Sequence, residues 1–305
     1  AISVDDGSAS APVLRTTLSV TNGTLSLAST IGLTSVSGDG TTSVTVIGAE
    51  SAINNALDGL AFTPTAFFNG SVNLQVTTDV KADLVAFYEF ENSADLADDT
   101  SPVGSNDGSV TGSPTTTFDA ARNSDVVVLD SVTDHLRFTG NRFGTPANVT
   151  VAAWVNANAV GNQEVISLGN SVVLRLNDSN QGAGVSGLYY NGSSWDHTNA
   201  STVVAGDGWH HVAYTVDDAA RVQTLYIDGV VVSTTSFSSA ISWTLNSNST
   251  IGMHVNGSSY EFDGRLDDAR IYGRALSASE IQAIANDGSV DTDVIAVSVT
   301  PVNDA

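Results

Sequence analysis

The sequence predicts an all-β protein built from packed antiparallel sheets, and three observations lead to that expectation. Only 14% of the 305 residues are charged, while Gly, Ser, Thr, Asn and Val, the residue types of strands and tight turns, are abundant. Val212, Tyr214 and Val216 alternate with small or polar residues, which is the period-two pattern of a strand. Asp228 and Gly229 separate two apolar triplets, a signal for a type I′ hairpin.

Charge and composition exclude several classes of partner. The formal net charge is −23 and Lys81 is the one lysine, so nucleic acid and anionic membrane surfaces would repel the chain, and we expect no nucleic-acid partner. The absence of cysteine excludes disulfides and thiolate chemistry. No apolar run is long enough to cross a membrane, so we expect no membrane insertion. Most acidic residues are Asp, which serves both in turns and as a calcium ligand.

Four segments, three in the first part of the chain and one at its end, carry a first resemblance. They are LSVTNGTLSL at 18–27, AINNALDGLAFTPT at 52–65, FNGSVNLQV at 68–76 and, far along the chain, DTDVIAVSVTPVNDA at 291–305. The first three resemble the body of a cadherin-like repeat of giant bacterial surface adhesins, and the last resembles its closing strand. The resemblance implies a cadherin-like, immunoglobulin-like β-sandwich that is split by a second domain inserted into one of its loops.

The insert carries a second resemblance, spread over segments in a fixed order. These are a strand with its acidic turn at 84–91 and 98–108, followed by 149–155, 208–217, 224–229 and 262–277. Each is weak alone, but the ordered set is similar to laminin-G-like domains of the concanavalin-A-like lectin and glucanase superfamily. The resemblance implies a jelly-roll sandwich. The expected domains are therefore 1–82, the insert 83–288, and the final cadherin-like strand in 289–305.

One helix is expected at the end of the insert. Ser277 and Glu280 form a capping box, in which each side chain satisfies a free backbone N–H at the start of the helix. Ile281 and Ile284 supply an apolar face, and Gly288 is placed to end the helix. We expect this helix to lead the chain back to the first domain.

Hydrolase activity is the first functional class to weigh, because the superfamily includes glucanases. Family 16 glycoside hydrolases carry a Glu-x-Asp-x-x-Glu pattern, since acid and nucleophile must face one side of the sugar, about 5–5.5 Å apart. The nearest match here runs from Glu261 through Asp263 to Leu266, so an apolar residue stands in place of the second glutamate. We therefore expect a protein that is not an enzyme.

Calcium is the cofactor that the resemblance implies. In such domains an ion often joins the first strand and its acidic turn to the final strand, and Ca²⁺ takes six to eight oxygen ligands. Carried over by motif, the ligands are Asp98 or Asp99 in the turn, Asp267 in the final strand, and Glu91. The alternative is that these carboxylates belong to solvated turns. A further site is expected where Asn303 and Asp304 meet Asp5 or Asp6 of a neighbouring repeat.

Aromatic residues outside the family's core motifs are the candidate ligand contacts. A sugar typically stacks one apolar face on Tyr or Trp and binds its hydroxyls to Asn, Asp and His. Adjacent Tyr189 and Tyr190 must point to opposite faces of a strand, and we assign Tyr190 to the exposed one. The candidate ligand-binding residues are Tyr190, Asn191, Trp195, Asp196, Trp243, His254 and Asn256.

Together these observations favour the ligand-binding region of a bacterial, calcium-dependent surface adhesin of the RTX type. The expected partners are a cell-surface or biofilm carbohydrate and neighbouring adhesin repeats, and the expected location is extracellular, on the cell surface, after type I secretion. The repeat-like ends suggest a piece of a longer protein. Two alternatives remain open: a laminin-G-like domain that binds protein or peptide, and a rigid spacer without a ligand.

Overall fold

The chain divides into two compact units, 1–82 together with 286–305, and 83–285. The computed structural model describes residues 2–4, 13–79, 84–101, 106–130, 133–158, 161–178, 184–256, 260–287 and 291–299. The expected junction residues Asp5, Asp6, Asn303 and Asp304 lie outside this part, as does Gly288. No helix of the described residues combines the length and apolarity that crossing a membrane requires.

The first unit is a five-stranded antiparallel sheet with strand order β22-β6-β1-β4-β3, accompanied by a two-stranded sheet of β2 and β5. Its elements are β1 (Val13–Val20), β2 (Gly23–Ser26), β3 (Leu33–Ser37), β4 (Ser43–Ala49), α1 (Glu50–Leu57), β5 (Ala61–Pro64), β6 (Gly70–Asp79) and β22 (Asp291–Val299). Alternate residues of β1, β4 and β6 are buried, as the period of a strand requires.

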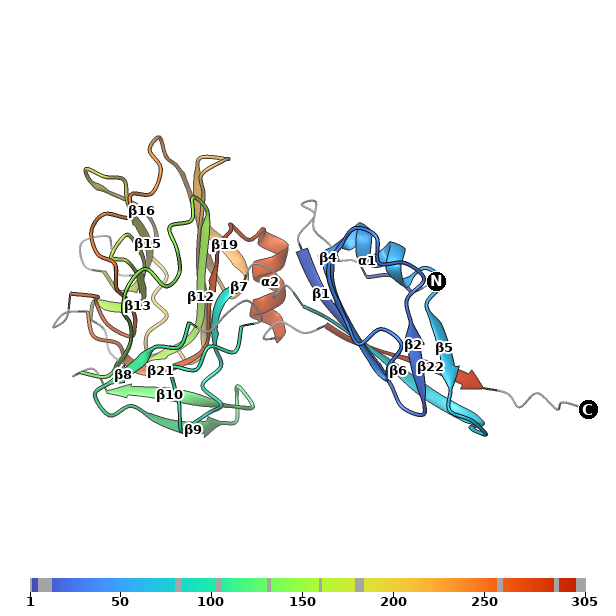
Figure 1. Ribbon diagram of the computed structural model, residues 1–305. Coiled ribbons are helices and arrows are strands. Elements are labelled where there is room, and N and C mark those ends of the chain that lie inside the picture. The colour runs from blue at the N-terminus through green and yellow to red at the C-terminus, as the bar shows by residue number, and fades with distance from the viewer. Residues whose placement is uncertain are drawn as a thin grey trace, which may run out of the picture. The chain divides into compact units, whose positions relative to one another are not determined.

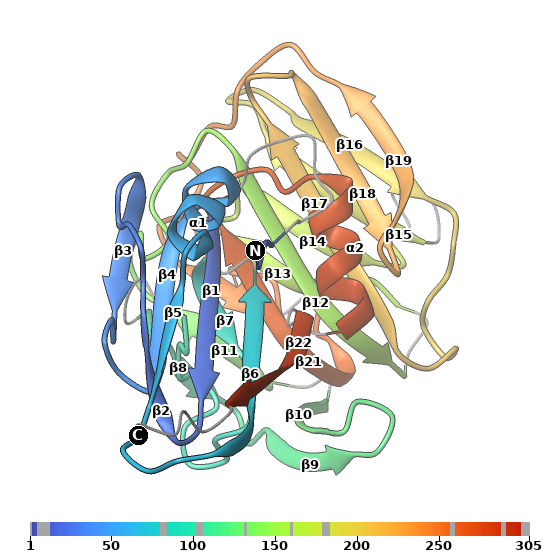
Figure 2. The same ribbon diagram turned by 90° about the vertical axis from the view of Figure 1, so that its right-hand side faces the viewer.

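The last strand belongs to this unit through its backbone. β22 pairs with β6 from Asp291 opposite Thr78 to Val299 opposite Gly70, and Figures 1 and 2 show the two strands side by side. The helix α1 was not expected from the sequence. Its buried residues Ala52, Ile53, Ala56 and Leu57 recur with helical spacing. That this unit is a cadherin-like repeat stays a prediction.

The second unit is a sandwich of two antiparallel sheets, which confirms the all-β class and the sandwich expected for the insert. One sheet has the order β19-β18-β17-β12-β21-β10-β9, with β7 also paired to β21, and the other has the order β16-β15-β14-β13-β20-β11-β8. The strands of the first sheet are β7 (Leu84–Tyr88), β9 (Thr115–Asp119), β10 (Ser124–Asp130), β12 (Val149–Ala157), β17 (His210–Asp217), β18 (Val222–Ile227), β19 (Val230–Ser236) and β21 (Asp263–Tyr272). The strands of the second are β8 (Ser109–Thr111), β11 (His135–Phe138), β13 (Gln163–Leu168), β14 (Val172–Leu176), β15 (Val185–Tyr190), β16 (Trp195–Ala200) and β20 (Ser249–Ile251). The helix α2 (Ala278–Asp287) follows β21.

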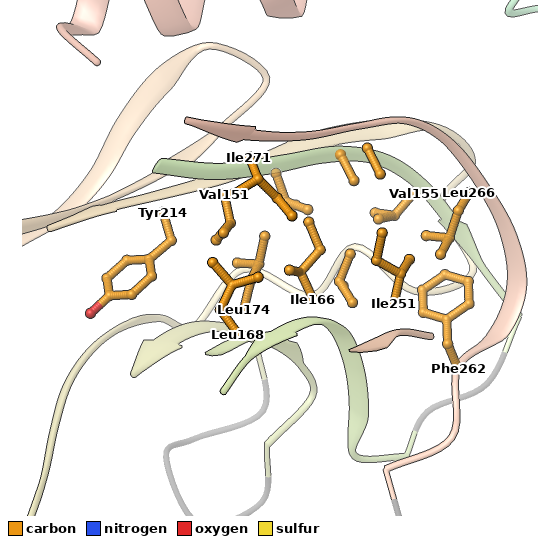
Figure 3. Packing of buried hydrophobic residues seen from close by; sticks show 14 of the residues in the cluster. Val151, Val155, Ile166, Leu168, Leu174, Tyr214, Ile251, Phe262, Leu266 and Ile271 are labelled. Carbon is orange, nitrogen blue, oxygen red and sulfur yellow. The ribbon is translucent and has the colours of Figure 1, made fainter. Parts of the chain in front are cut away.

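The hydrophobic core of this unit lies between the two sheets. In Figure 3, Val151 and Ile271 of the eight-stranded sheet face Leu168 and Leu174 of the seven-stranded sheet. All four are buried, and burying one such side chain stabilises a fold by about 1.5–3 kcal/mol. The alternate residues of each strand point away from this core, so each sheet also has an outer face on which polar groups can gather.

Two local predictions are confirmed. Asp228 and Gly229 have φ angles of 50° and 76°, the left-handed values that a type I′ turn needs at both central positions, and they join β18 to β19. At the start of α2, the Glu280 backbone N–H donates to Ser277 Oγ at 3.3 Å, and the Ser277 N–H donates to Glu280 Oε2 at 2.7 Å. Both features depend on residues close together in sequence.

Candidate functional site

A pocket of about 320 Å³ lies on the seven-stranded sheet, on the face that points away from the core. Strands β14, β15 and β16, the turns at their ends and the loop before β21 contribute to it. Its lining residues are Asn170, Arg175, Asp178, Leu188, Trp195, His254 and Tyr260. Two of these, Trp195 and His254, are residues that the sequence predicts to bind ligand.

Trp195 lines the pocket, whereas its neighbour Tyr190, which the sequence also predicts to bind ligand, does not. The two residues pair across the β15–β16 hairpin, and their ring centroids are 5.7 Å apart. Trp195 is 37% exposed, whereas Tyr189 points into the core and is fully buried. The alternation of side chains along a strand thus places Tyr190 on the exposed face, as predicted.

Asn191 and Asp196 hold this hairpin together. Asn191 Oδ1 accepts hydrogen bonds from the backbone N–H groups of Ser193 and Ser194, each at 2.9 Å. Its Nδ2 donates to Asp196 Oδ2 at 2.9 Å, and the same oxygen accepts the Tyr189 hydroxyl at 2.8 Å. The sequence predicts that these two residues contact ligand. Neither lines the pocket, and their bonds give them the role of positioning Trp195.

Two charged lining residues, Arg175 and Asp178, form a buried cluster with Glu164, which lies behind Arg175 and does not line the pocket. Arg175 Nη2 contacts Glu164 Oε2 at 2.8 Å, and Arg175 Nη1 contacts Asp178 Oδ2 at 2.7 Å. The two carboxylate side chains are almost fully buried. Burial by itself lowers the pKa of Arg175, but the charges and hydrogen bonds of Glu164 and Asp178 outweigh it and raise that pKa. The guanidinium therefore stays charged.

His254 and Tyr260 close the other side of the pocket, from the loop between β20 and β21. The Tyr260 ring centroid lies 3.9 Å from Arg175 Cζ and 5.6 Å from the His254 ring centroid. His254 Nδ1 lies 3.2 Å from Glu164 Oε2, and the Glu164 backbone N–H donates to the Tyr260 carbonyl at 2.8 Å. Tyr260 has a φ of 59°, an unusual value for a residue with a side chain, and these contacts hold it there.

The structure places two other predicted contacts away from the pocket. The Trp243 side chain packs against the hydrophobic core, and its indole N–H donates to the Pro146 carbonyl at 3.1 Å. Asn256 Oδ1 accepts a hydrogen bond from Asn246 at 2.9 Å. Neither lines the pocket. The correction for Trp243 has a simple reason: an aromatic residue outside the core motifs of a family can still cover the edge of the core.

The predicted calcium ligands are engaged by the protein. Asp99 Oδ1 accepts the backbone N–H groups of Phe87 and Ser101, each at 2.9 Å, and its Oδ2 accepts the Asn106 N–H at 3.0 Å. Asp267 Oδ2 lies 2.8 Å from Arg122 Nε, so a guanidinium already supplies positive charge there.

The other two ligands show no ion site either. Glu91 Oε1 accepts the Ser124 hydroxyl at 2.5 Å, and Asp98 is half-buried in the turn that follows β7. Within the ranges that the structure describes, no three residues of the types His, Cys, Asp or Glu form a group that could hold a metal ion. The four residues do not fit one site there, and calcium binding stays a prediction.

The match to the family comes from the sequence of the second unit. A family model described as the concanavalin A-like lectin/glucanases superfamily matches residues 130–282, which is half of the chain. The chain belongs to this superfamily. Leu266, which stands where the glucanase pattern needs its second glutamate, is buried in the core of this superfamily fold. No curated protein matches the sequence.

Several solved structures share the superfamily fold. Domain 4 of AbnA, a GH43 extracellular arabinanase from Geobacillus stearothermophilus, in complex with arabinotriose, has a TM-score of 0.56 and 20% identity. The match covers 67% of this chain and 98% of that domain. The binding domain of Paraclostridial Mosquitocidal Protein 1 has a TM-score of 0.52 at 17% identity, and that of botulinum neurotoxin serotype C1 has 0.51 at 14%. Each of these two matches covers 68% of this chain and 52% of the toxin domain. At such identities the likeness shows the fold.

Sequence reasoning missed five lining residues: Asn170, Arg175, Asp178, Leu188 and Tyr260. One signal was present. Arg175 interrupts the apolar strand VVLRL, and Glu164 lies in the strand QEVISL. Every residue of these two strands is buried. Charged residues are almost never fully buried unless they are paired, so two opposite charges in two adjacent apolar strands predict an ion pair.

Proposed function

We propose that the second unit binds carbohydrate in the pocket beside Trp195. The observation that carries this proposal is a partly exposed indole next to a floor of fixed polar groups, on the face of the sheet opposite the core. One face of a pyranose or furanose ring is rich in C–H groups and stacks on an aromatic ring, while its hydroxyls need hydrogen-bond partners. A pocket that offers both matches this chemistry.

The polar partners come from three lining residues. Asn170 Oδ1 is buried and has no hydrogen-bond partner among the described residues, so a donor would satisfy it. His254 is partly exposed and supplies a ring nitrogen, and Asp178 supplies carboxylate oxygens. The volume of about 320 Å³ is at the small end for ligand pockets, which favours a single sugar residue or the end of a glycan chain.

The comparisons support a binding role. The arabinanase domain of similar fold was solved with arabinotriose, and the two toxin domains are named as binding domains. Such a role also agrees with Leu266 in place of a catalytic glutamate. We expect modest affinity, because one sugar residue offers few contacts. Dissociation constants should be millimolar, which corresponds to a binding free energy of about −4 kcal/mol. Many copies on one surface would then supply avidity.

The test is a glycan array followed by calorimetry on the full chain and its variants. Trp195→Ala should abolish binding to whichever glycan the unmutated protein captures and should leave the fold intact. Phe118→Ala is the matched control, because Phe118 is also an exposed aromatic residue, at 62%, but lies on β9 in the other sheet. Normal binding by Trp195→Ala would place the site elsewhere. Capture of peptides and of no glycan would favour the protein-binding alternative.

The adhesin context rests on the sequence resemblance. We propose that the first unit is a cadherin-like mount within a larger RTX-type surface adhesin, secreted by a type I system, with neighbouring repeats as partners and calcium as cofactor. In the biological setting the carbohydrate would belong to another cell or to a biofilm. Thermal melts of the full chain with calcium and with EDTA test the cofactor, and identical curves would contradict it. A chain in which a short turn replaces 84–288 should still unfold cooperatively if the first unit is an independent repeat.

A further inference from the structure

We propose that the pocket selects uncharged sugars and discriminates against carboxylated ones such as uronates. This inference rests on the proposed carbohydrate function and deepens it. An arginine in a sugar pocket commonly suggests recognition of an acidic ligand, because a guanidinium binds a carboxylate through two parallel hydrogen bonds. In this pocket, the contacts of Arg175 argue for the opposite selectivity.

The edges of the Arg175 guanidinium that could bind a carboxylate through two hydrogen bonds already donate to Glu164 and Asp178. Nε and Nη2, which form one edge, both donate to Glu164 Oε2, at 3.3 and 2.8 Å. Nη1 donates to Asp178 Oδ2 at 2.7 Å, so the other edge has lost one of its paired donors. A ligand carboxylate therefore finds no edge with two free parallel N–H groups.

The face of the guanidinium is covered as well. The Tyr260 ring lies with its centroid 3.9 Å from Arg175 Cζ, a stacking distance for a cation on an aromatic ring. The Arg175 side chain is 10% exposed. The arginine thus serves as the support on which Tyr260 rests, and the pocket presents the tyrosine ring to a ligand in place of the positive charge.

Two carboxylates share the one guanidinium of Arg175. Glu164 and Asp178 both contact it, and both carboxylate side chains are almost fully buried. Charges in such a place are screened far less than surface charges, so they repel an incoming anion. The net charge of −23 on the whole chain acts in the same direction. A neutral sugar meets no such repulsion.

The experiment compares matched pairs of ligands on the full chain. Methyl glycosides of glucose, galactose and mannose are titrated beside the corresponding uronides, which differ by one carboxylate. For whichever neutral glycoside binds, we expect its uronide to bind about tenfold more weakly, the ratio that corresponds to about 1.4 kcal/mol. Uronide binding that equals or exceeds that of the neutral partner would overturn the inference and leave the carbohydrate function standing. Binding of neither member of any pair would count against the carbohydrate function itself.

A substitution then assigns the discrimination to the floor of the pocket. Asp178→Asn removes one negative charge and keeps the shape, so the ratio of uronide to glycoside dissociation constants should fall toward one. Asp207→Asn is the control, because Asp207 has an 80% exposed side chain and does not line the pocket. An unchanged ratio in a folded Asp178→Asn protein would contradict the inference. If that variant does not fold, the ligand pairs measured on the unmutated protein still test whether the pocket discriminates against carboxylated sugars.

Discussion

The second unit contains two clusters of the same chemistry on its two sheets, and they differ in what surrounds them. In one, Arg175 is bound by Glu164 and Asp178 and stacks on Tyr260 with 3.9 Å between Cζ and the ring centroid. In the other, Arg122 is bound by Asp267 and Asp268, and its Cζ lies 4.1 Å from the ring centroid of Trp154. We refer to them as the Arg175 cluster and the Arg122 cluster.

The two arginine side chains are similarly exposed, at 10% for Arg175 and 12% for Arg122, so exposure does not separate the clusters. Arg175 and Asp178 line a pocket that the exposed indole of Trp195 borders. The Arg122 cluster joins the turn before β10 to the outer face of the eight-stranded sheet, where Asp267 pairs in register with Trp154. An arginine held between carboxylates over an aromatic ring is thus not a binding signature by itself. The open volume beside it separates a candidate site from a structural support.

The largest expected effect is on the Arg122 cluster. Arg122→Ala leaves the buried Asp267 without its cation and should lower the unfolding free energy of the second unit by about 3–5 kcal/mol. Urea denaturation followed by tryptophan fluorescence measures this, because all four tryptophans lie in the second unit. The loss should be larger at pH 8 than at pH 5, since protonation of Asp267 relieves the unpaired charge. A loss below about 1 kcal/mol would show that the cluster behaves as a surface ion pair.

The second effect is a pH dependence that the Arg122 cluster imposes on stability. Burial, and then the charge of Asp268, raise the pKa of Asp267 from 3.8 to about 7 despite the ion pair with Arg122. The folded state therefore holds a proton that the unfolded state releases above pH 4. The contribution of Asp267 to stability is complete below about pH 4, is lost as the pH rises to about 7, and amounts to at most about 4 kcal/mol.

Asp267→Asn measures this contribution, because an amide does not titrate. The difference in unfolding free energy between variant and unmutated protein should change between about pH 4 and pH 8 and level off above about pH 8. Contributions from all other groups cancel in that difference as long as the fold is kept. A difference that does not vary with pH would mean that Asp267 is ionised throughout this range in the folded state.

The third prediction separates the clusters by function. Arg175→Lys keeps the charge but loses the planar fork and the stacking on Tyr260, so it should cost about 1–2 kcal/mol of stability and about tenfold in sugar affinity. Arg122→Lys should cost a similar amount of stability and leave sugar affinity unchanged. Calorimetric titration with the glycan found on the array provides the affinities. Equal losses of sugar affinity in both variants would contradict the assignment of a binding role to the Arg175 cluster alone.

The smallest effect is expected at an exposed version of the same arrangement. Arg221 Nη1 lies 2.7 Å from Asp218 Oδ1, and its Cζ is 5.8 Å from the Phe237 ring centroid, but the arginine side chain is 46% exposed. Solvent screens such a pair, so Arg221→Ala should change the unfolding free energy by less than about 1 kcal/mol. This variant serves as the reference for the other arginine substitutions. A loss of unfolding free energy as large as that of Arg122→Ala would mean that burial does not determine how much each arginine contributes to stability.

The features that sequence reasoning predicted correctly depend on neighbouring residues. The turn at Asp228 and Gly229 follows from the tolerance of these residues for positive φ, and the capping box from two side chains three positions apart. The alternation of Tyr189 and Tyr190 follows from the geometry of a single strand. Trp195 and His254, which the sequence singles out as aromatic and polar residues outside the core pattern, line the pocket, and their binding of a ligand stays a prediction.

The strand pattern, the all-β class and the local turns and caps could be predicted from the sequence alone. The support of Tyr260 by Arg175 and the pairing of Asp267 with Arg122 follow from the tertiary structure alone. The physical reason is the range of the interactions. Turns and alternation are set by the covalent geometry of a few consecutive residues, whereas a pocket and an ion pair form only when sheet register and loop packing bring distant side chains within a few ångströms.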